Sequence, residues 1–377
     1  MSQATTKTAA DDALAEGEPE PTTEAAERPE VRLRLGGTTA PGVFSFLGAA
    51  AGAFALCWLL YERLLPLSGA LGFWLSWFVV FNGLYLLIGR TQWDSRTARE
   101  NAVRALAVSA GVVVVALIAD QVGFVSVRGW AAARHLTFFT QDMEHTGPLS
   151  PLTSGGALAA IVGTLEQLGL ATLFSVPLGI GAAVYLAEIG GRTAKAVRTL
   201  IEAMTALPSI VAGLFILGVA ILTLGLQKSG FAASLALTVM MMPIVTRAAE
   251  VVIRLVPGTL REASYALGSS HWRTVWNVVL PTARRGLVTA VVLGMARGVG
   301  ETSPVLLTSG FTSHLNLNPF HDHQVSLPVY IWNYVRMPTP NMVARGFAAA
   351  MTLMIIVLVL FVTARTLGGR ADKEGSR

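Results

Sequence analysis

An arginine and a glutamate lie four residues apart inside a strongly apolar stretch of the sequence. They are Arg297 and Glu301, in the run G-M-A-R-G-V-G-E-T-S-P at 294–304. In a helix this spacing places both side chains on one face. The planar guanidinium group suits tetrahedral oxyanions and keeps its charge at any working pH, and the carboxylate would neutralise it when no anion is bound. The alternative is a structural ion pair that lets an apolar helix tolerate two charges.

Three more charged residues belong to apolar segments. Arg247 follows Pro243 in M-P-I-V-T-R-A-A-E, where it could serve simply as a cationic anchor near the cytoplasmic end of its helix. Glu202 is expected at the membrane interface. Glu166 is not expected to bind an anion directly, because its carboxylate would repel negative charge.

A polar segment at 262–281 lies between two long apolar segments and reads E-A-S-Y-A-L-G-S-S-H-W-R-T-V-W-N-V-V-L-P. It predicts a short helix over 262–267, a turn at Gly268, where glycine can adopt the left-handed conformation, and a second helix over 271–279. That second helix should end at Pro281, which lacks an amide proton. Two short helices crossing at a glycine form a compact projection for a partner protein. The alternative is an amphipathic hairpin at the membrane interface without a partner.

The spacing of this segment resembles the coupling loop of importer-type ABC permeases. Its signature positions are Glu262, Ala263, Ser264, Gly268, Val278, Leu280 and Pro281. The resemblance implies that the loop sits in a groove of a cytoplasmic ATPase and passes the closing motion of that ATPase to the membrane helices.

Three other stretches resemble the PstA-type permease subunits of bacterial phosphate importers. They are R-G-V-G-E-T-S-P at 297–304, A-L-P-S-I-V-A-G-L-F at 206–215 and the Arg247 stretch at 242–250. The resemblance runs from about Arg99 to Leu367. It implies that Arg297, Glu301 and Arg247 line a phosphate pathway.

The same resemblance implies a set of partners. These are a second homologous permease subunit of the PstC type, a dimer of PstB-type ATPase subunits and an extracytoplasmic phosphate-binding protein of the PstS type. We expect no cofactor on this chain, because ATP and Mg would bind to the partner ATPase. No G-x-x-x-x-G-K-[ST] loop occurs in the sequence, so we expect a transport subunit rather than an enzyme.

The composition places the chain in a lipid bilayer. Of its 377 residues, 53% are hydrophobic and only 14% are charged, and the mean hydropathy is +0.57, which is too apolar for an ordinary soluble domain. We expect an all-α polytopic membrane protein with about eight transmembrane helices, six of them in a type I ABC importer permease core that follows an N-terminal hairpin. Apolar runs near the ~20 residues that span a bilayer occur at 43–61, 69–89, 103–122, 157–187, 200–226, 229–246, 285–308 and 343–364.

Lysine and arginine near helix ends are retained in the cytoplasm, and here they cluster after the second and fourth runs, within 250–285 and at the end of the chain. We therefore expect a multi-pass protein of the bacterial plasma (inner) membrane with both termini cytoplasmic, and we take the net charge of +5 as a sign of topology rather than of nucleic-acid binding. The expected domains are a disordered acidic tail (1–42), an extra transmembrane hairpin (43–98), the permease domain (99–367) with its coupling loop (250–285), and a cytoplasmic tail (368–377).

Two longer segments at 125–156 and 310–342 would form an outer vestibule, and the resemblance implies that a binding protein docks there. The second contains His314, His321 and His323, but these histidines lack the spacing of a metal site, so we expect a solvated loop and no metal. Cys57 is the only cysteine and is expected to pack inside the first run.

Three alternative functions remain open at this point. One is an importer of another oxyanion, sulfate or molybdate, whose permeases share the coupling loop. Another is a secondary carrier or channel that needs no ATPase. The third is a membrane scaffold or signalling partner with a minor transport role.

Overall fold

The computed structural model describes residues 40–64, 69–92 and 95–370, and within these ranges the regular structure is entirely helical. The all-α prediction is therefore confirmed. The acidic segment predicted to be disordered lies almost entirely outside the described residues. Internal contacts divide the chain into two compact units, residues 1–115 and 116–377.

The first unit holds α1 (Ala40–Leu59), a short π-helix η1 (Leu60–Leu64), α2 (Ala70–Gln92) and the beginning of α3 (Ser95–Ala133). Ala49, Ala53 and Cys57 recur at every fourth position of α1 and are fully buried, because small side chains let α2 approach closely. Cys57 thus packs as expected. Trp77 of α2 donates a hydrogen bond of 3.1 Å to the Ala50 carbonyl oxygen.

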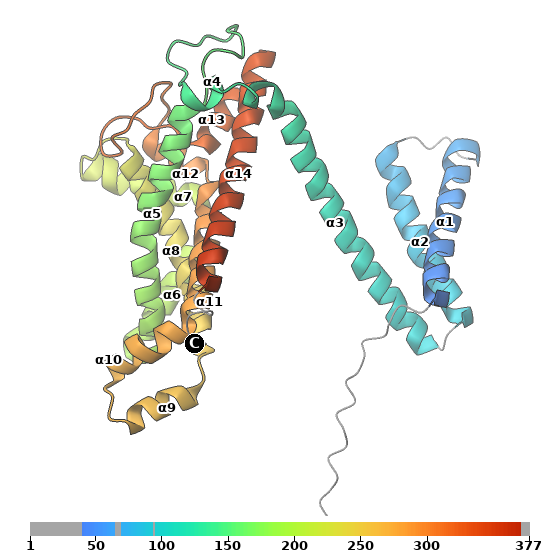
Figure 1. Cartoon of the computed structure of the whole chain (residues 1–377), viewed down its shortest axis with the longest axis horizontal. Helices are drawn as coiled ribbons and strands as arrows, with labels where there is room; N and C mark the ends of the chain where they lie inside the picture. The colour runs from blue at the N-terminus through green and yellow to red at the C-terminus, as the bar shows by residue number, and fades with distance from the viewer. Residues whose placement is uncertain (1–39, 65–68, 93–94, 371–377) are drawn as a thin grey trace, which may run out of the picture. The chain divides into compact units, whose positions relative to one another are not determined.

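The second unit is a helical bundle with two short helices, α9 and α10, projecting from one end (Figure 1). Its elements after α3 are α4 (Thr137–Thr140), α5 (Leu158–Val184), η2 (Tyr185–Ile189), α6 (Arg192–Ala206), α7 (Ser209–Ile216), η3 (Leu217–Thr223), α8 (Gly230–Arg254), α9 (Gly258–Ala266), α10 (His271–Thr274), η4 (Val275–Val279), α11 (Leu280–Val299), α12 (Ser303–Ser309), α13 (Leu327–Tyr334) and α14 (Pro340–Arg370).

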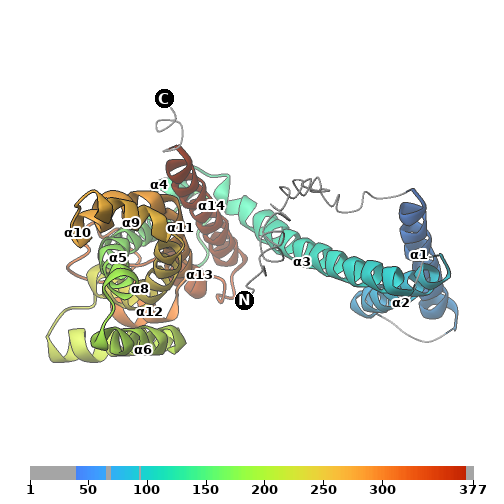
Figure 2. The ribbon, with the colours of Figure 1, turned by 90° about the horizontal axis from the view of Figure 1, so that it is seen from below.

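Helix α8 is the centre of this bundle. It is the most deeply buried of the long apolar helices and packs against α5, α6, α7, α11 and α12. In the view from the α9–α10 end, α5, α11 and α12 lie beside it (Figure 2). Glycines make this packing possible. A Cβ atom added at Gly294 of α11 would lie 2.5 Å from Val245 Cγ2 of α8, and one added at Gly298 would lie 2.6 Å from Met241 Sδ.

Seven helices of the described residues are long and apolar enough to cross a membrane, and a broken pair makes an eighth. The expected count of about eight is met in this way. The fifth run, 200–226, is not one continuous helix: α6 and α7 meet at 108°. The break lies at Leu207 and Pro208, because the proline ring forces the residue before it into an extended conformation, as the Leu207 ψ angle of 132° shows.

The other two prolines of the apolar helices do not break them. Pro177 lies inside α5 and Pro243 inside α8. Of these three prolines, only Pro208 falls between two helices. Neighbouring helices can support the backbone groups that a proline leaves without partners, and α5 and α8 pack against each other along their lengths.

The prediction that the second coupling helix ends at Pro281 is wrong. α10 runs through the wide turn of η4 directly into α11, and Pro281 lies in the first turn of α11. Proline is accepted there because its missing N–H would have no helical partner anyway. The seventh apolar run, predicted as 285–308, accordingly belongs to a longer helical stretch over 271–299, followed by a break at Gly300 and the short α12.

The two outer segments pack against each other at the opposite end of the unit from α9. Met143 donates its backbone N–H to the Ser313 carbonyl at 2.9 Å, and Leu315 donates to Asp142 Oδ2 at 3.1 Å. The fully buried Arg345 of α14 donates to the carbonyl oxygens of 151 and 154. The segments predicted to form an outer vestibule are therefore tied into one layer, whereas their docking role stays a prediction.

Candidate functional site

Arg297 and Glu301 form the ion pair that their spacing predicts. Arg297 lies in the last turn of α11 and Glu301 follows the break at Gly300, so that Arg297 Nη1 donates to Glu301 Oε1. The two side chains have unequal surroundings, since 51% of the arginine side chain is exposed but only 8% of the glutamate side chain. The carboxylate is thus buried in the bundle, whereas the guanidinium, which carries five N–H donors, is half-exposed.

The guanidinium of Arg297 borders a pocket at the break between α6 and α7. Its walls come from three helices besides α11, through Met204, Thr205, Leu207, Ala212, Val239, Met240 and Ile244. The break at Pro208 therefore helps to position this site, because α6, the break and α7 all contribute to its lining. Arg297 supplies the only charged group to a lining that is otherwise apolar apart from Thr205.

Arg247 lies on the same face of α8 as the pocket. It follows Met240 and Ile244 at steps of four and three residues, which is the spacing of one helix face. Its Nη2 lies 2.8 Å from Glu202 Oε1 of α6, and the side chains are 45% and 49% exposed. The sequence singled out Arg247 and Glu202 separately but gave no sign that they pair. The structure thus places two half-exposed arginines, each beside a carboxylate, along one face.

A cluster of buried amides lies behind Glu301 and was missed by the sequence analysis. Gln167 of α5 donates to Gln324 Oε1 at 3.2 Å, and Gln324 donates to Glu166 Oε2 at 2.5 Å. Gln167 also lines a small pocket together with Glu301 and Ser326. Glutamine in an apolar helix is a weak signal, and Gln324 comes from an outer segment, so local sequence could not bring them together. Glu166 pairs with an amide here, and the expectation that it does not bind an anion directly stays a prediction.

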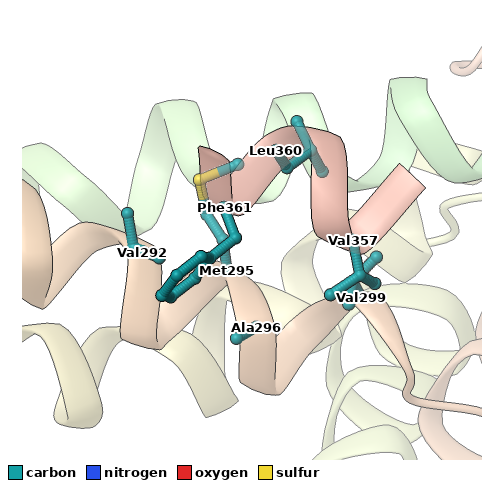
Figure 3. A pocket seen from close by; sticks show the side chains of 7 residues that line it. All are labelled: Val292, Met295, Ala296, Val299, Val357, Leu360 and Phe361. Carbon is teal, nitrogen blue, oxygen red and sulfur yellow. The ribbon is translucent and has the colours of Figure 1, made fainter. Parts of the chain in front are cut away.

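A third pocket of the bundle has the wrong chemistry for an anion. Figure 3 shows its lining, in which α11 and α14 face each other with hydrocarbon and thioether side chains alone. With no hydrogen-bond donor in its lining, this pocket cannot compensate the desolvation of an anion. It suits an acyl chain or another apolar group. The lining residues are Val292, Met295, Ala296, Val299, Val357, Leu360 and Phe361.

The coupling loop has the two-helix form that its sequence predicts, with the first helix beginning four residues earlier than expected, at Gly258. Gly268 has a φ of 80°, so the left-handed turn is confirmed. Ser264 and Thr274 are buried between the two arms and lie 2.8 Å apart through their hydroxyl oxygens. Ser264 therefore holds the loop together.

The outer surface of the loop carries both polar and apolar residues. Glu262, Ala263 and Gly268 are exposed there. Large hydrophobic side chains on the same loop are exposed as well, namely Tyr265, Leu267, Trp272 and Trp276. An exposed group of aromatic and aliphatic side chains at the end of a bundle is typical of a protein-binding surface. Of the remaining signature residues, Val278 and Leu280 are half-buried and Pro281 is exposed.

The outer histidines do not converge. Within the described part of the chain no group of three or more His, Cys, Asp or Glu side chains could hold a metal ion. His314 instead shares a hydrogen bond of 2.7 Å with Thr312 through its Nδ1 atom. The described residues therefore give no support for a metal site in this loop.

Comparisons with known proteins identify relatives of this arrangement. Residues 175–367 match the family model described as "Binding-protein-dependent transport system inner membrane component". The phosphate transport system permease protein PstA 1 of Mycobacterium tuberculosis (strain ATCC 25618 / H37Rv) is 42% identical over 241 residues, which cover 64% of this chain and 78% of that protein. The corresponding PstA protein of Mycobacterium leprae is 39% identical over 62% of this chain and 76% of that protein. The PstA protein of Haemophilus influenzae is 36% identical over 61% and 80%.

Among solved structures, an inward-facing form of the MetNI methionine ABC transporter superposes on 57% of this chain and 95% of its own, with 20% identity and a TM-score of 0.45.

Proposed function

Because the chain belongs to the inner-membrane components of binding-protein-dependent transport systems, and among them to the PstA permeases, we propose that it forms one half of the pathway through which an ATP-driven importer brings inorganic phosphate into the cytoplasm. Both termini and the α9–α10 loop would then lie on the cytoplasmic side. The observation that carries the proposal is the face of α8 and α11 on which Arg247 and Arg297 are half-exposed beside carboxylates. A second, homologous permease of the PstC type would cover this face.

The two arginines suit an anion that binds weakly and moves on through the pathway. A charge at the centre of a membrane helix costs ~2.5–3.5 kcal/mol, and Glu301 offsets part of this cost for Arg297 while no substrate is present. An entering phosphate would compete with Glu301 for the donors of Arg297, since guanidinium groups bind phosphate through paired N–H bonds. The buried carboxylate remains close by and recaptures the arginine, which keeps phosphate binding weak enough for release.

The α9–α10 loop supplies the connection to an energy source. We assign its exposed face to contact with one subunit of a PstB-type ATPase dimer, where ATP and Mg bind. The outer layer formed by the segments around Asp142 and Leu315 is assigned to docking of a PstS-type phosphate-binding protein. Closing of the ATPases on the loop would move α9 and, through it, the helices that carry the arginines.

Uptake of radiolabelled phosphate into proteoliposomes tests this proposal. The vesicles hold the full complex with internal ATP, and the binding protein is added outside with sulfate or molybdate as competitor. We expect ATP-dependent phosphate uptake that resists both competitors and falls by about 100-fold or more in Arg297→Gln, as expected when one charged hydrogen bond worth roughly 3 kcal/mol is lost. Arg365→Gln is the matched control, because this arginine is exposed near the end of α14 and lies outside both the Arg297 pocket and the coupling loop.

Two results would contradict the proposal in different ways. Uptake without ATP would mean a secondary carrier, and uptake of sulfate or molybdate in place of phosphate would keep the transport machine but change its substrate. An Arg297→Gln complex that imports phosphate at the wild-type rate would remove this arginine from the pathway.

A further inference from the structure

Arg261 stands directly before Glu262 in α9, yet its side chain does not point to the surface where a partner would dock. It reaches back into the bundle, where its Nη2 donates to Glu188 Oε1 at 2.7 Å and its Nε donates to Glu188 Oε2 at 3.3 Å. The side chains are only 19% and 5% exposed. This is a bidentate, largely buried ion pair between α9 and η2. The π-helix η2 follows α5 directly and ends that long helical stretch.

The same guanidinium also binds the end of α8. Nη1 donates to the Val256 carbonyl at 2.6 Å and Nη2 to the Ile253 carbonyl at 3.0 Å. Ile253 lies in the last turn of α8 and Val256 just beyond it, so Arg261 of α9 joins the end of α8 to the next element. Three pieces of structure, α9, η2 and the end of α8, therefore meet at one side chain.

A second network reinforces this junction. Glu250 of α8 accepts hydrogen bonds from Arg198 of α6 at 2.7 Å and from Arg254 of α8 at 2.9 Å, and Arg254 also donates to the Leu186 carbonyl of η2 at 3.1 Å. Helix α6 and η2 are thereby held to the end of α8 as well. Helix α10, by contrast, is joined to α9 by the turn at Gly268 and the hydroxyl pair of Ser264 and Thr274.

These contacts make α9 part of the rigid body formed by the ends of α5 and α8. Moving α9 relative to them would separate a buried ion pair and leave Glu188 without its partner in a place from which water is largely excluded, which is strongly unfavourable. A force on α9 therefore displaces α8 before it breaks the junction. Helix α8 carries Arg247 and, through Met240 and Ile244, one wall of the Arg297 pocket.

We propose that Arg261 and Glu188 are positioning residues that convert displacement of the coupling loop into displacement of α5 and α8. This inference rests on the proposed function for the source of the force, an ATPase that docks on the loop. In this proposal the junction determines how many anions are imported for each ATP hydrolysed. A junction that only stabilised the fold would not change that number.

The test measures phosphate uptake and ATP hydrolysis in the same proteoliposomes, with the full complex and the binding protein present. In Arg261→Gln and Glu188→Gln we expect the number of phosphate ions imported per ATP hydrolysed to fall by about tenfold or more, within the usual range of coupling between sites, while ATP hydrolysis continues. Arg261→Lys keeps the charge but not the fork of donors and should give an intermediate yield. Arg192→Gln, an exposed arginine at the start of α6, is the control and should keep the wild-type yield.

The outcomes separate coupling from folding. Variants that lower uptake and ATP hydrolysis in equal proportion, or that leave the yield unchanged, would overturn the proposal. If the glutamine variants fail to assemble with the ATPase, Arg261→Lys decides, because a wild-type yield in that variant would also refute it. A wild-type complex that imports sulfate would refute the substrate of the proposed function, yet the yield could still be measured with that anion.

Discussion

At the scale of single residues, the informative feature is the unequal exposure of the two members of the Arg297–Glu301 pair. The buried carboxylate is held in the bundle by its surroundings, whereas the half-exposed guanidinium can turn toward another anion. A pair that served only to hide two charges from lipid would gain most if both members were buried together. The asymmetry favours a site in which the arginine changes partners.

This asymmetry predicts the behaviour of Glu301→Gln. Without its carboxylate partner, Arg297 should be stabilised by an external anion more than it is in the wild-type protein, because the anion takes over the neutralising role. We expect phosphate to raise the melting temperature of the variant complex by about 2–4 °C more than that of the wild type, a shift that corresponds to roughly 1 kcal/mol. Thermal unfolding with phosphate and with gluconate at equal ionic strength measures it.

The same measurement on Glu202→Gln serves for comparison. Its partner Arg247 is equally exposed, but both members of that pair face outward, so we expect a smaller difference. Equal phosphate shifts in wild type and Glu301→Gln would show that Arg297 does not exchange its partner for an anion.

At the scale of elements, the close approach of α8 and α11 determines where both arginines lie. This approach depends on glycines, since Val245 and Met241 occupy the space that a side chain at Gly294 or Gly298 would need. A side chain there would either push α11 away from α8 or displace these neighbours, and so change the pocket that Arg297 borders.

The two glycines should not respond alike to substitution. We expect Gly294→Ala to destabilise the protein by about 1–3 kcal/mol, as overpacking usually does, because the branched Val245 side chain is stiff. Gly298→Ala should cost less, since Met241 can rearrange. The amount of monodisperse protein that remains after heating, measured by size-exclusion chromatography, ranks the variants.

Gly181→Ala on α5 is the control, because no atom lies within 4 Å of a Cβ added at that position. Removing a helical glycine there should be neutral or stabilising by up to about 1 kcal/mol. If Gly294→Ala proved as stable as this control, the packing account of the α8–α11 contact would be wrong.

At the scale of the whole molecule, the proposed transport elements all lie in the second unit. The family match covers residues 175–367, and both arginine pairs and the coupling loop lie within this range. The first unit builds its own small core from α1 and α2, with Phe81 fully buried and Phe46 packed edge-on against it. We therefore expect the hairpin to contribute to something other than the transport cycle.

Deletion of residues 1–98 tests this division. We expect the shortened chain, assembled with its partners, to keep ATP-dependent phosphate uptake within about twofold of the full chain, a difference of less than roughly 0.5 kcal/mol in the activation barrier. Uptake in proteoliposomes, normalised to the amount of assembled complex, is the measurement. Loss of uptake with assembly intact would show that the hairpin takes part in transport.

The sequence by itself determined the class of the protein and the approximate positions of most of its apolar helices, and it singled out two candidate sites. These follow from local rules: apolar length for the spans, the four-residue spacing of Arg297 and Glu301, and the glycine at the coupling turn. The local rule failed at Pro281, because a proline can begin a helix as well as end one, and the choice depends on how η4 leads into α11.

Only the tertiary structure decided which charges from different helices meet. Glu188 and Arg261 are 73 residues apart in the chain, and Arg198 and Glu250 are 52 apart. No periodicity of the sequence links such positions, because their encounter depends on how α5, α6, α8 and α9 pack together. The break at Pro208 is similar: proline predicts a bend there, but the 108° angle that opens the Arg297 pocket follows from the packing of α7 against α8 and α12.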